Sequence, residues 1–217
     1  MDLNIKNLNK IEDREYDKVY DLVKESFKNY EKLVGAFPDW DDRQAAIEMV
    51  LSFYLAYDWK YGAAYSLDEE MKEVLVVCHS DVMDYSEDKI LAAECENDRF
   101  RAASARLSDE QVEFWNEFFD ELDRQERKLE IPRPHIYVDF LAVKEGFKGE
   151  GRGSRIIGKL KEYADETGLP IMLFTNGEDD VRFYKRNGFR ILAVTESEKY
   201  KFENTYMLYE PEVKAQA

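Results

Sequence analysis

Apolar residues recur at helical spacing along two stretches near the start of the chain. The stretches cover about residues 13–30 and 41–57. Because residues three and four apart share one face of a helix, both stretches predict amphipathic helices. The glycine and proline of residues 35–38 predict a break between them. A short strand is expected before the first helix, at residues 4–8.

Shorter apolar runs follow and predict strands. Residues 62–67 and 74–79 are joined by an acidic link, which is typical of a hairpin. Later in the chain, strands are expected at residues 135–143, 171–175, 189–194 and 201–209, and helices at 151–167 and 178–187. Gly168 and Pro170 end the first of these helices. The order of elements predicts a mixed α/β fold, with the last two strands as partners.

Residues 80–134 differ from the rest of the chain. They contain 16 acidic and 8 basic side chains, so 8 − 16 gives −8, half of the total net charge of −16. A short helix is expected at residues 86–94. Ser108 and Gln111 match a capping box at the start of a longer helix that reaches about residue 128.

The composition narrows the classes of partner. Apolar residues make up 44% of the chain and aromatic residues 14%, enough for a sizeable core. A net charge of −16 repels phosphates and anionic lipids and attracts cations, although it also serves solubility. We therefore expect no nucleic-acid and no membrane partner. The chain shows no signal region or membrane-spanning run, which predicts a cytoplasmic protein.

Cysteine and histidine are too few and too widely spaced to predict a metal site. Each type occurs twice, as Cys78, Cys95, His79 and His135. Cys78 lies in an apolar run and is expected to be a buried thiol.

The most informative segment is the glycine-rich turn between the strand at 135–143 and the helix at 151–167. Gly149, Gly151 and Gly153 let the backbone approach a ligand, and the free amides at a helix start bind anions. Lys148 and Arg152 add positive charge, so the turn suits a pyrophosphate. The Rossmann and P-loop glycine patterns are both absent. An ordinary glycine-rich helix start fits the same residues.

Two motifs resemble those of the GNAT superfamily of N-acetyltransferases. The first reads Leu141-Ala142-Val143 followed by Lys148-Gly149-Glu150-Gly151-Arg152-Gly153, with Lys148 where the family has arginine or glutamine. The second reads Phe174-Thr175-Asn176 followed by Phe183-Tyr184-Lys185-Arg186-Asn187-Gly188-Phe189. The resemblance covers about residues 135–210. Residues 80–134 depart from it, because the family usually joins those strands by a short connection.

The resemblance implies a fold and an activity. The fold is a mixed, mostly antiparallel central sheet flanked by helices, in one domain over residues 1–217 with a helical insertion at 80–134 between the third and fourth strands. The activity is transfer of the acetyl group of acetyl-CoA to a primary amine of a small cationic molecule. A protein or peptide amine as acceptor, or a non-catalytic acyl-CoA sensor, are the alternatives. A homodimer is compatible with this interpretation.

The resemblance also assigns residues to the cofactor. The expected acetyl-CoA contacts are Leu141, Ala142, Val143, Lys148, Gly149, Gly151, Arg152, Gly153, Ser154 and Asn176. The backbone amides of Leu141 and Val143 should pair with the pantetheine arm as a strand would. Tyr184 matches the tyrosine that protonates the departing thiolate, with a core tyrosine as the alternative.

Asp139 is the candidate general base, acting directly or through water. Strict alternation along the strand places it with His135, Tyr137 and Leu141, opposite an apolar face of Ile136, Val138, Phe140 and Ala142. An aspartate of pKa about 3.9 is a weak base, so burial must raise its pKa. A structural hydrogen bond or simple attraction of the amine is the alternative, and Tyr137 and His135 are weaker candidates.

The acceptor pocket is the least defined part of the prediction. Its candidate residues are Tyr30, Phe37, Trp40 and Tyr54, each of which also suits the core. Residues 80–134 are placed in the sequence to cover this pocket, and they suit a dimer surface or a solvated cap as well.

Overall fold

The computed structural model describes residues 3–29, 40–83, 85–95, 97–200 and 202–211. Its sheet has seven strands in the order β1-β2-β3-β4-β5-β7-β6. The strands are β1 Asn9–Lys10, β2 Ala63–Ser66, β3 Glu73–His79, β4 Ile136–Val143, β5 Ile171–Thr175, β6 Arg190–Ser197 and β7 Phe202–Tyr209. Only β4 and β5 pair in parallel among these strands, so the predicted mostly antiparallel sheet is confirmed.

The predicted helices are present, but α3 is not amphipathic as expected, because it buries residues around most of its circumference. They are η1 Asp13–Glu15, α1 Tyr16–Phe27, α3 Trp40–Tyr61, α4 Glu87–Cys95, α5 Asp98–Ser104, α6 Asp109–Glu126, α7 Arg152–Thr167 and α8 Glu178–Arg186. The predicted break at residues 35–38 lies outside the described residues. So do Tyr30, Phe37 and the side chain of Trp40, which were candidates for the acceptor pocket.

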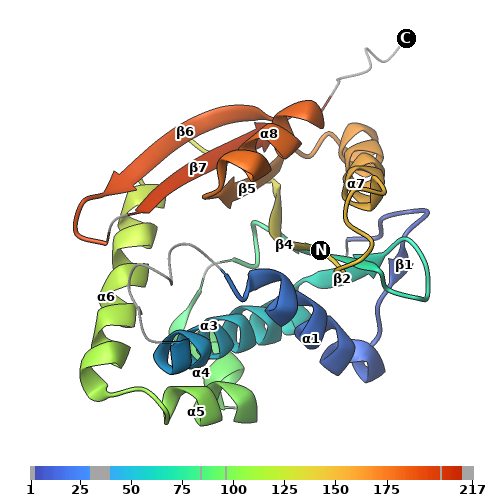
Figure 1. Cartoon of the computed structure of the whole chain (residues 1–217). Helices are drawn as coiled ribbons and strands as arrows, with labels where there is room; N and C mark the ends of the chain where they lie inside the picture. Colours follow the sequence, from blue (N-terminus) through green and yellow to red (C-terminus); the bar gives the residue numbers. More distant parts are fainter. Residues whose placement is uncertain (1–2, 30–39, 84, 96, 201, 212–217) are drawn as a thin grey trace.

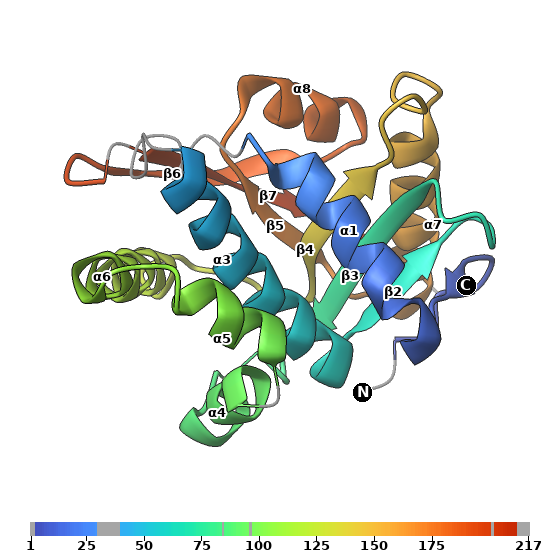
Figure 2. The ribbon, with the colours of Figure 1, turned by 60° about the horizontal axis from the view of Figure 1, so that its bottom comes forward.

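Helices cover both faces of the sheet (Figures 1 and 2). α1 and α3 pack on one face, against Val74, Val76, Phe140 and Ala142. α7 packs on the other face, where it buries a set of β3, β4 and β5 side chains. This set consists of Leu75, Val77, Ile136, Val138, Ile171 and Leu173. The site described below lies between these two layers.

The pairing of β3 with β4 contains a β-bulge at Asp139. Val76 lies opposite Phe140, but the next residue of β3, Val77, lies opposite Val138, so Asp139 is left without a partner. An extra residue in one strand resets the alternation of its side chains. The predicted faces of this strand are therefore wrong beyond the bulge. Leu141 points to the α7 layer with Val138 and Ile136, whereas Phe140 points to the α1 and α3 layer.

β4 and β5 separate soon after they meet. Their ladder joins two residue pairs, Ile136 with Ile171 and Tyr137 with Met172. The bulge follows immediately, and no further pair of these two fully described strands is joined. The rest of β4 thus leaves an opening in the middle of the sheet.

The helices of residues 80–134 lie beside α3 and extend toward the β6–β7 hairpin (Figure 1). The predicted capping box is present. The Ser108 hydroxyl accepts from the Gln111 amide, and the Gln111 side chain accepts from the Ser108 amide. α5 was not predicted, because its seven residues carry too short an apolar pattern. Its cap was visible in the sequence: the side chain of Asn97 accepts from the Phe100 amide.

The opening strand was predicted too early. Residues 4 and 5 are not in a strand, the chain turns at Lys6 and Asn7, where Asn7 has a φ of 63°, and β1 begins at Asn9. Leu3 and Ile5 still enter the core. The alternation of apolar residues here therefore reflects burial in the core and not pairing in a strand.

A buried ion pair joins α7 to the β2–β3 hairpin. The Arg152 guanidinium contacts the carboxylates of Glu73 and Asp68, the latter at 2.5 Å. The Glu73 side chain is fully buried, and its Oε1 also accepts from the Leu67 amide at 2.8 Å. This pair fixes the start of α7 relative to β3.

We expect Glu73→Gln to lower the free energy of unfolding by about 3 kcal/mol, because it leaves part of a buried guanidinium charge unmatched. Urea denaturation measures this value. The matched control is Glu70→Gln. Glu70 pairs with Lys72, but the side chain of Glu70 is 67% exposed. This control should cost less than about 1 kcal/mol. Equal losses in both variants would contradict the structural role of the Arg152 pair.

Candidate active site

The glycine-rich turn connects the end of β4 to the start of α7. Gly149 and Gly151 have φ values of 85° and 74°, which side chains with a Cβ rarely adopt. Gly151 caps the helix without a side chain, so the first amides of α7 have no side-chain cap. The first turn of this 16-residue helix, with its uncapped amides, offers an anion site at the end of β4.

The two basic residues of this turn differ in what their side chains contact. Lys148 is exposed and pairs with Glu145 at 2.9 Å. The Arg152 side chain is buried between Glu73 and Asp68. Its positive charge is matched by these carboxylates, so only the main chain of Arg152 can serve an anion in the turn.

The backbone of β4 presents hydrogen-bonding groups to the opening between β4 and β5. The Lys144 amide donates to the Lys72 carbonyl at 2.8 Å, which places residue 144 on the β3 side. Successive residues of a strand direct these groups to opposite edges. Val143 and Leu141 therefore direct their amides and carbonyls to the β5 side, where the ladder has ended.

The residues of the second motif lie on the same side of the molecule. A Cβ on Gly153 would lie 3.2 Å from Phe183 and 3.8 Å from Val143, so α7, α8 and β4 converge here. Tyr184 is buried in the α7 layer, with its ring edge-on to Phe183 and Phe189 at 5.0 and 5.4 Å. Burial, with a smaller effect of the Asp180 charge, raises the pKa of Tyr184.

Asn176 follows β5, and its side chain is already engaged. The amide nitrogen donates to the Glu203 carbonyl and, at 2.7 Å, to Asn204 Oδ1. These contacts tie the end of β5 to β7.

Asp139 lies at the bulge with two further polar residues. One ligand atom each of Asp58, Cys78 and Asp139 lies within 4.8 Å of the others. The Cys78 thiol donates to Asp58 Oδ1 at 2.8 Å. Gly62 allows this approach of α3 to β3, because a Cβ there would lie 2.5 Å from Cys78 Sγ. The predicted buried thiol is confirmed.

Both carboxyl groups favour protonation. Burial raises the pKa of Asp58 to about 7. Burial, and next the charge of Asp58, raises the pKa of Asp139 well above its ordinary value. No lysine, arginine or histidine of the described residues forms an ion pair with either carboxyl group. The site is therefore acidic, and its two carboxyl groups have no counter-ion within the part of the chain that the structure describes.

Residues 80–134 contribute to the surroundings of Asp139. Tyr85 stacks on Tyr57 of α3. Burial is the largest cause that raises the pKa of Tyr85, and the charge of Asp139 is the second largest. Burial and then Asp139 raise the pKa of Glu126, at the end of α6, to about 7. Leu129 and Ile131 pack on Tyr137 in the next layer. His135, one of the weaker candidates for the base, lies just before β4, and its Nδ1 forms a hydrogen bond with the Pro132 carbonyl.

Comparison with known proteins decides the family. The acetyltransferase (GNAT) family model matches residues 64–189, more than half of the chain. The chain belongs to the GNAT acetyltransferase family.

Solved structures agree with this fold. A Corynebacterium glutamicum structure described as histone acetyltransferase HPA2 and related acetyltransferase has a TM-score of 0.53 at 15% identity, over 97% of this chain and 98% of its own. An N-acetyltransferase from Staphylococcus aureus Mu50 has a TM-score of 0.53 at 16% identity, over 93% and 99%. A comparison with curated proteins gave no match.

The sequence analysis of this GNAT acetyltransferase missed Asp58, Tyr85 and Glu126. Asp58 could have been found, because it is an acidic residue next to the apolar stripe of its helix. Tyr85 and Glu126 carry no local signal of a site. Tyr54 is the acceptor-pocket candidate whose side chain the structure describes. It is half-buried, with its ring centroid 5.7 Å from that of Phe119 and 6.4 Å from that of Tyr85.

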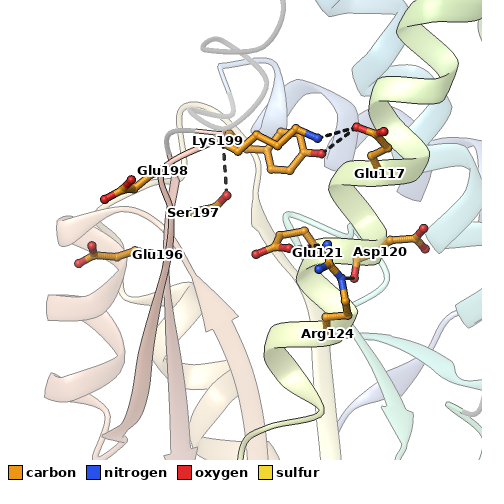
Figure 3. Close-up of a pocket in the computed structure, with 9 residues that line it drawn as sticks. Glu117, Asp120, Glu121, Arg124, Glu196, Ser197, Glu198 and Lys199 are labelled. Atoms are coloured by element: carbon orange, nitrogen blue, oxygen red, sulfur yellow. Dashed lines mark hydrogen bonds and ion pairs between the residues drawn. The ribbon is translucent and has the colours of Figure 1, made fainter.

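A second acidic region of the acetyltransferase is an open groove between α6 and the β6–β7 hairpin (Figure 3). Its volume is about 470 Å³, and it is lined by Glu117, Asp120, Glu121, Arg124 and residues 196–200. Lys199 crosses it to bind Glu117 at 2.6 Å. The Gln125 side chain links the two walls by donating to the Glu196 carbonyl.

None of the described helices is long and apolar enough to span a membrane.

The raised pKa of Asp58 predicts a pH dependence of stability. Between about pH 4 and the folded pKa of about 7, the folded state binds more protons than the unfolded state. The free energy of unfolding therefore falls as pH rises, by up to about 1.4 kcal/mol per pH unit for each such proton. Asp58→Asn removes this proton, so the variant should gain stability relative to wild type as pH rises.

Urea denaturation at about pH 4.5 and about pH 7.5 measures the difference. Asp88→Asn is the control, because Asp88 is an exposed residue of α4. Its effect should be the same at both values. An Asp58→Asn effect that does not change with pH would contradict the assignment.

Proposed function

We propose that the protein is an N-acetyltransferase that transfers the acetyl group of acetyl-CoA to a primary amine of a small cationic molecule. One observation carries the proposal. The opening between β4 and β5 has the glycine-rich turn at one end and Asp139 beside the other. A strand-like ligand with a charged end fits this arrangement, because it can pair with a free strand edge and place its anion on a helix start.

The residues divide the cofactor between them. The amides at the start of α7, around Lys148, Gly149 and Gly151, bind the pyrophosphate, with Arg152, Gly153 and Ser154 contributing their main chain. The backbone groups of Leu141 and Val143 pair with the pantetheine arm, while the Ala142 side chain remains in the core. Asn176 holds the end of β5 at the far side of the opening. The thioester supplies the acetyl group, and no metal is required.

The remaining residues move protons. The acceptor enters as an ammonium ion and must lose two protons overall as the carbon–nitrogen bond forms and the carbon–sulfur bond breaks. Asp139 accepts one of them. The other reaches the departing sulfur, to which the Tyr184 hydroxyl donates a hydrogen bond. Because the pKa of Tyr184 is raised, its hydroxyl keeps its proton and can donate it in a hydrogen bond.

The acid groups also favour a cationic acceptor. Burial raises the pKa values of Asp58, Asp139 and Glu126, and nearby carboxylates raise those of Asp139 and Glu126 further. An ammonium group supplies the missing opposite charge and lowers this cost. The acidic groove beside α6 adds attraction at longer range.

Release of free CoA thiol across a panel of amines tests the function. The panel holds small monoamines, diamines, amino sugars and peptides with a free N-terminus or a lysine. We expect thiol release with small cationic amines, well above hydrolysis without an amine. Release only with peptides would favour a protein acceptor. Tight CoA binding with no release for any amine would contradict the enzymatic function and favour a sensor.

Two substitutions should separate binding from chemistry. Asp139→Asn and Tyr184→Phe should each lower kcat by at least about tenfold, because each removes a group that exchanges or stabilises a proton. Binding of CoA, followed by calorimetry, should remain because its proposed contacts are main-chain groups. Asp88→Asn serves as the control for a lost carboxylate. An unchanged kcat would remove the substituted residue from the mechanism.

A further inference from the structure

The carboxyl groups of Asp58 and Asp139 face each other without a donor between them. A carboxyl oxygen of each lies within 4.8 Å of one of the other, and the Oδ2 atom of each is buried. Neither Oδ2 atom receives a hydrogen bond from the other described residues. A carboxylate oxygen can only accept, so a hydrogen bond between two carboxyl groups requires a proton on one of them.

The rest of the cluster leaves this proton between the carboxyl groups. Asp58 is 1% exposed, and its other oxygen is already occupied by the Cys78 thiol. Asp139 is half-buried as a residue and is the member nearer to solvent. A second proton or a cation can therefore reach the pair at Asp139.

We propose that Asp58 and Asp139 form one unit that shares a single proton, and that this unit, rather than Asp139 alone, is the base of the reaction. The inference rests on the proposed function. Asp139 is the group that contacts the acceptor amine. Asp58 is a positioning residue, which acts through Asp139, and Cys78 holds it in place.

The step balances in protons. The resting pair carries one proton and a charge of −1. The acceptor ammonium transfers a proton to Asp139 while the proton already held by Asp139 moves to Asp58, which leaves a neutral pair with two protons and a neutral amine. The nitrogen lone pair is then free to attack. When the product leaves, the pair returns one proton to solvent.

The pair explains how an aspartate can act as a base near neutral pH. Two like charges in contact cannot both ionise in a buried site, so the protons leave in two separate steps that belong to the pair. The lower step falls near a pKa of about 7. A base is most effective when its pKa lies near the working pH.

Other titratable groups surround the pair and do not remove this need for a proton. They are Tyr16 on α1, Cys78 on β3, Tyr85 and Lys89 after β3, Glu126 on α6 and Tyr137 on β4. Within this set Lys89 is the one cation, and it donates to the Val82 carbonyl. The others add negative charge or are neutral, so they favour retention of the shared proton.

A metal ion is the other species that could join these oxygens. The donor set is two carboxyl groups and one thiol. The thiol donates its proton to Asp58, and burial raises its pKa, whereas a metal ligand must be a thiolate. The geometry therefore favours a proton.

The experiment is titration of the intact protein by NMR, with a carbon-13 label at the Cγ of aspartate. In wild type, we expect two aspartate signals that each move in two steps, with one proton still held at about pH 8. In Asp58→Asn, the Asp139 signal should move in a single step at lower pH. The pH dependence of kcat/KM should shift in the same direction, with a loss of about tenfold near neutral pH. Asp88→Asn should leave both the signals and the pH profile unchanged.

Several results would overturn the pair. Both carboxyl groups could be ionised by about pH 6 in wild type, which needs no variant to observe. The Asp139 titration could be unaffected by Asp58→Asn. Metal analysis could find about one ion per chain whose removal by EDTA shifts both signals. If the two-step titration is present but no amine releases thiol, the proposed acetyl transfer fails and the shared proton remains.

Discussion

The β-bulge at Asp139 is the constraint on which the rest of the site depends. One extra residue in β4 turns the remainder of the strand over. As a result, the backbone of Leu141 and Val143 meets the opening beside β5, and Asp139 lies next to α3 on the opposite side of the same strand. A regular strand would have placed a different set of side chains against Asp58. The fold thus sets the position of both the cofactor groove and the acidic site by one irregular pairing.

The acidic site is maintained against its own cost in stability. Burial of two carboxyl groups in contact is unfavourable, and neither has a cationic partner among the described residues. Compare Glu73, which is equally buried but is matched by Arg152 and by backbone and hydroxyl donors. The first arrangement leaves a charge to be met by a ligand, whereas the second satisfies its charge inside the fold. This contrast separates a group that stabilises the structure from a group that can perform chemistry.

Local patterns were enough to predict most of the elements. The periodicity of α1 and the glycines before α7 are properties of neighbouring residues, and the structure confirms them, whereas α3 is confirmed as a helix but not as an amphipathic one. The bulge left no trace, because Val138 and Phe140 are both apolar and continue an apparently regular alternation. The direction of the Arg152 side chain could not be predicted either, since its partners Asp68 and Glu73 are distant in the sequence. Partners of buried charges are set by packing, which a one-dimensional pattern does not contain.

The role of residues 80–134 follows from where their ends lie. α6 ends with Glu126 near Asp139, and the residues after it cover Tyr137, while Gln125 binds the β6–β7 hairpin. Tyr85, at the other end of the segment, stacks on α3 beside Asp58. Both ends therefore lie near enough to the carboxyl pair for the charge of Asp139 to act on Glu126 and Tyr85. Since burial is the largest cause of the raised pKa values of Asp58 and Asp139, this helical segment helps to set the strength of the base although it provides neither carboxyl group.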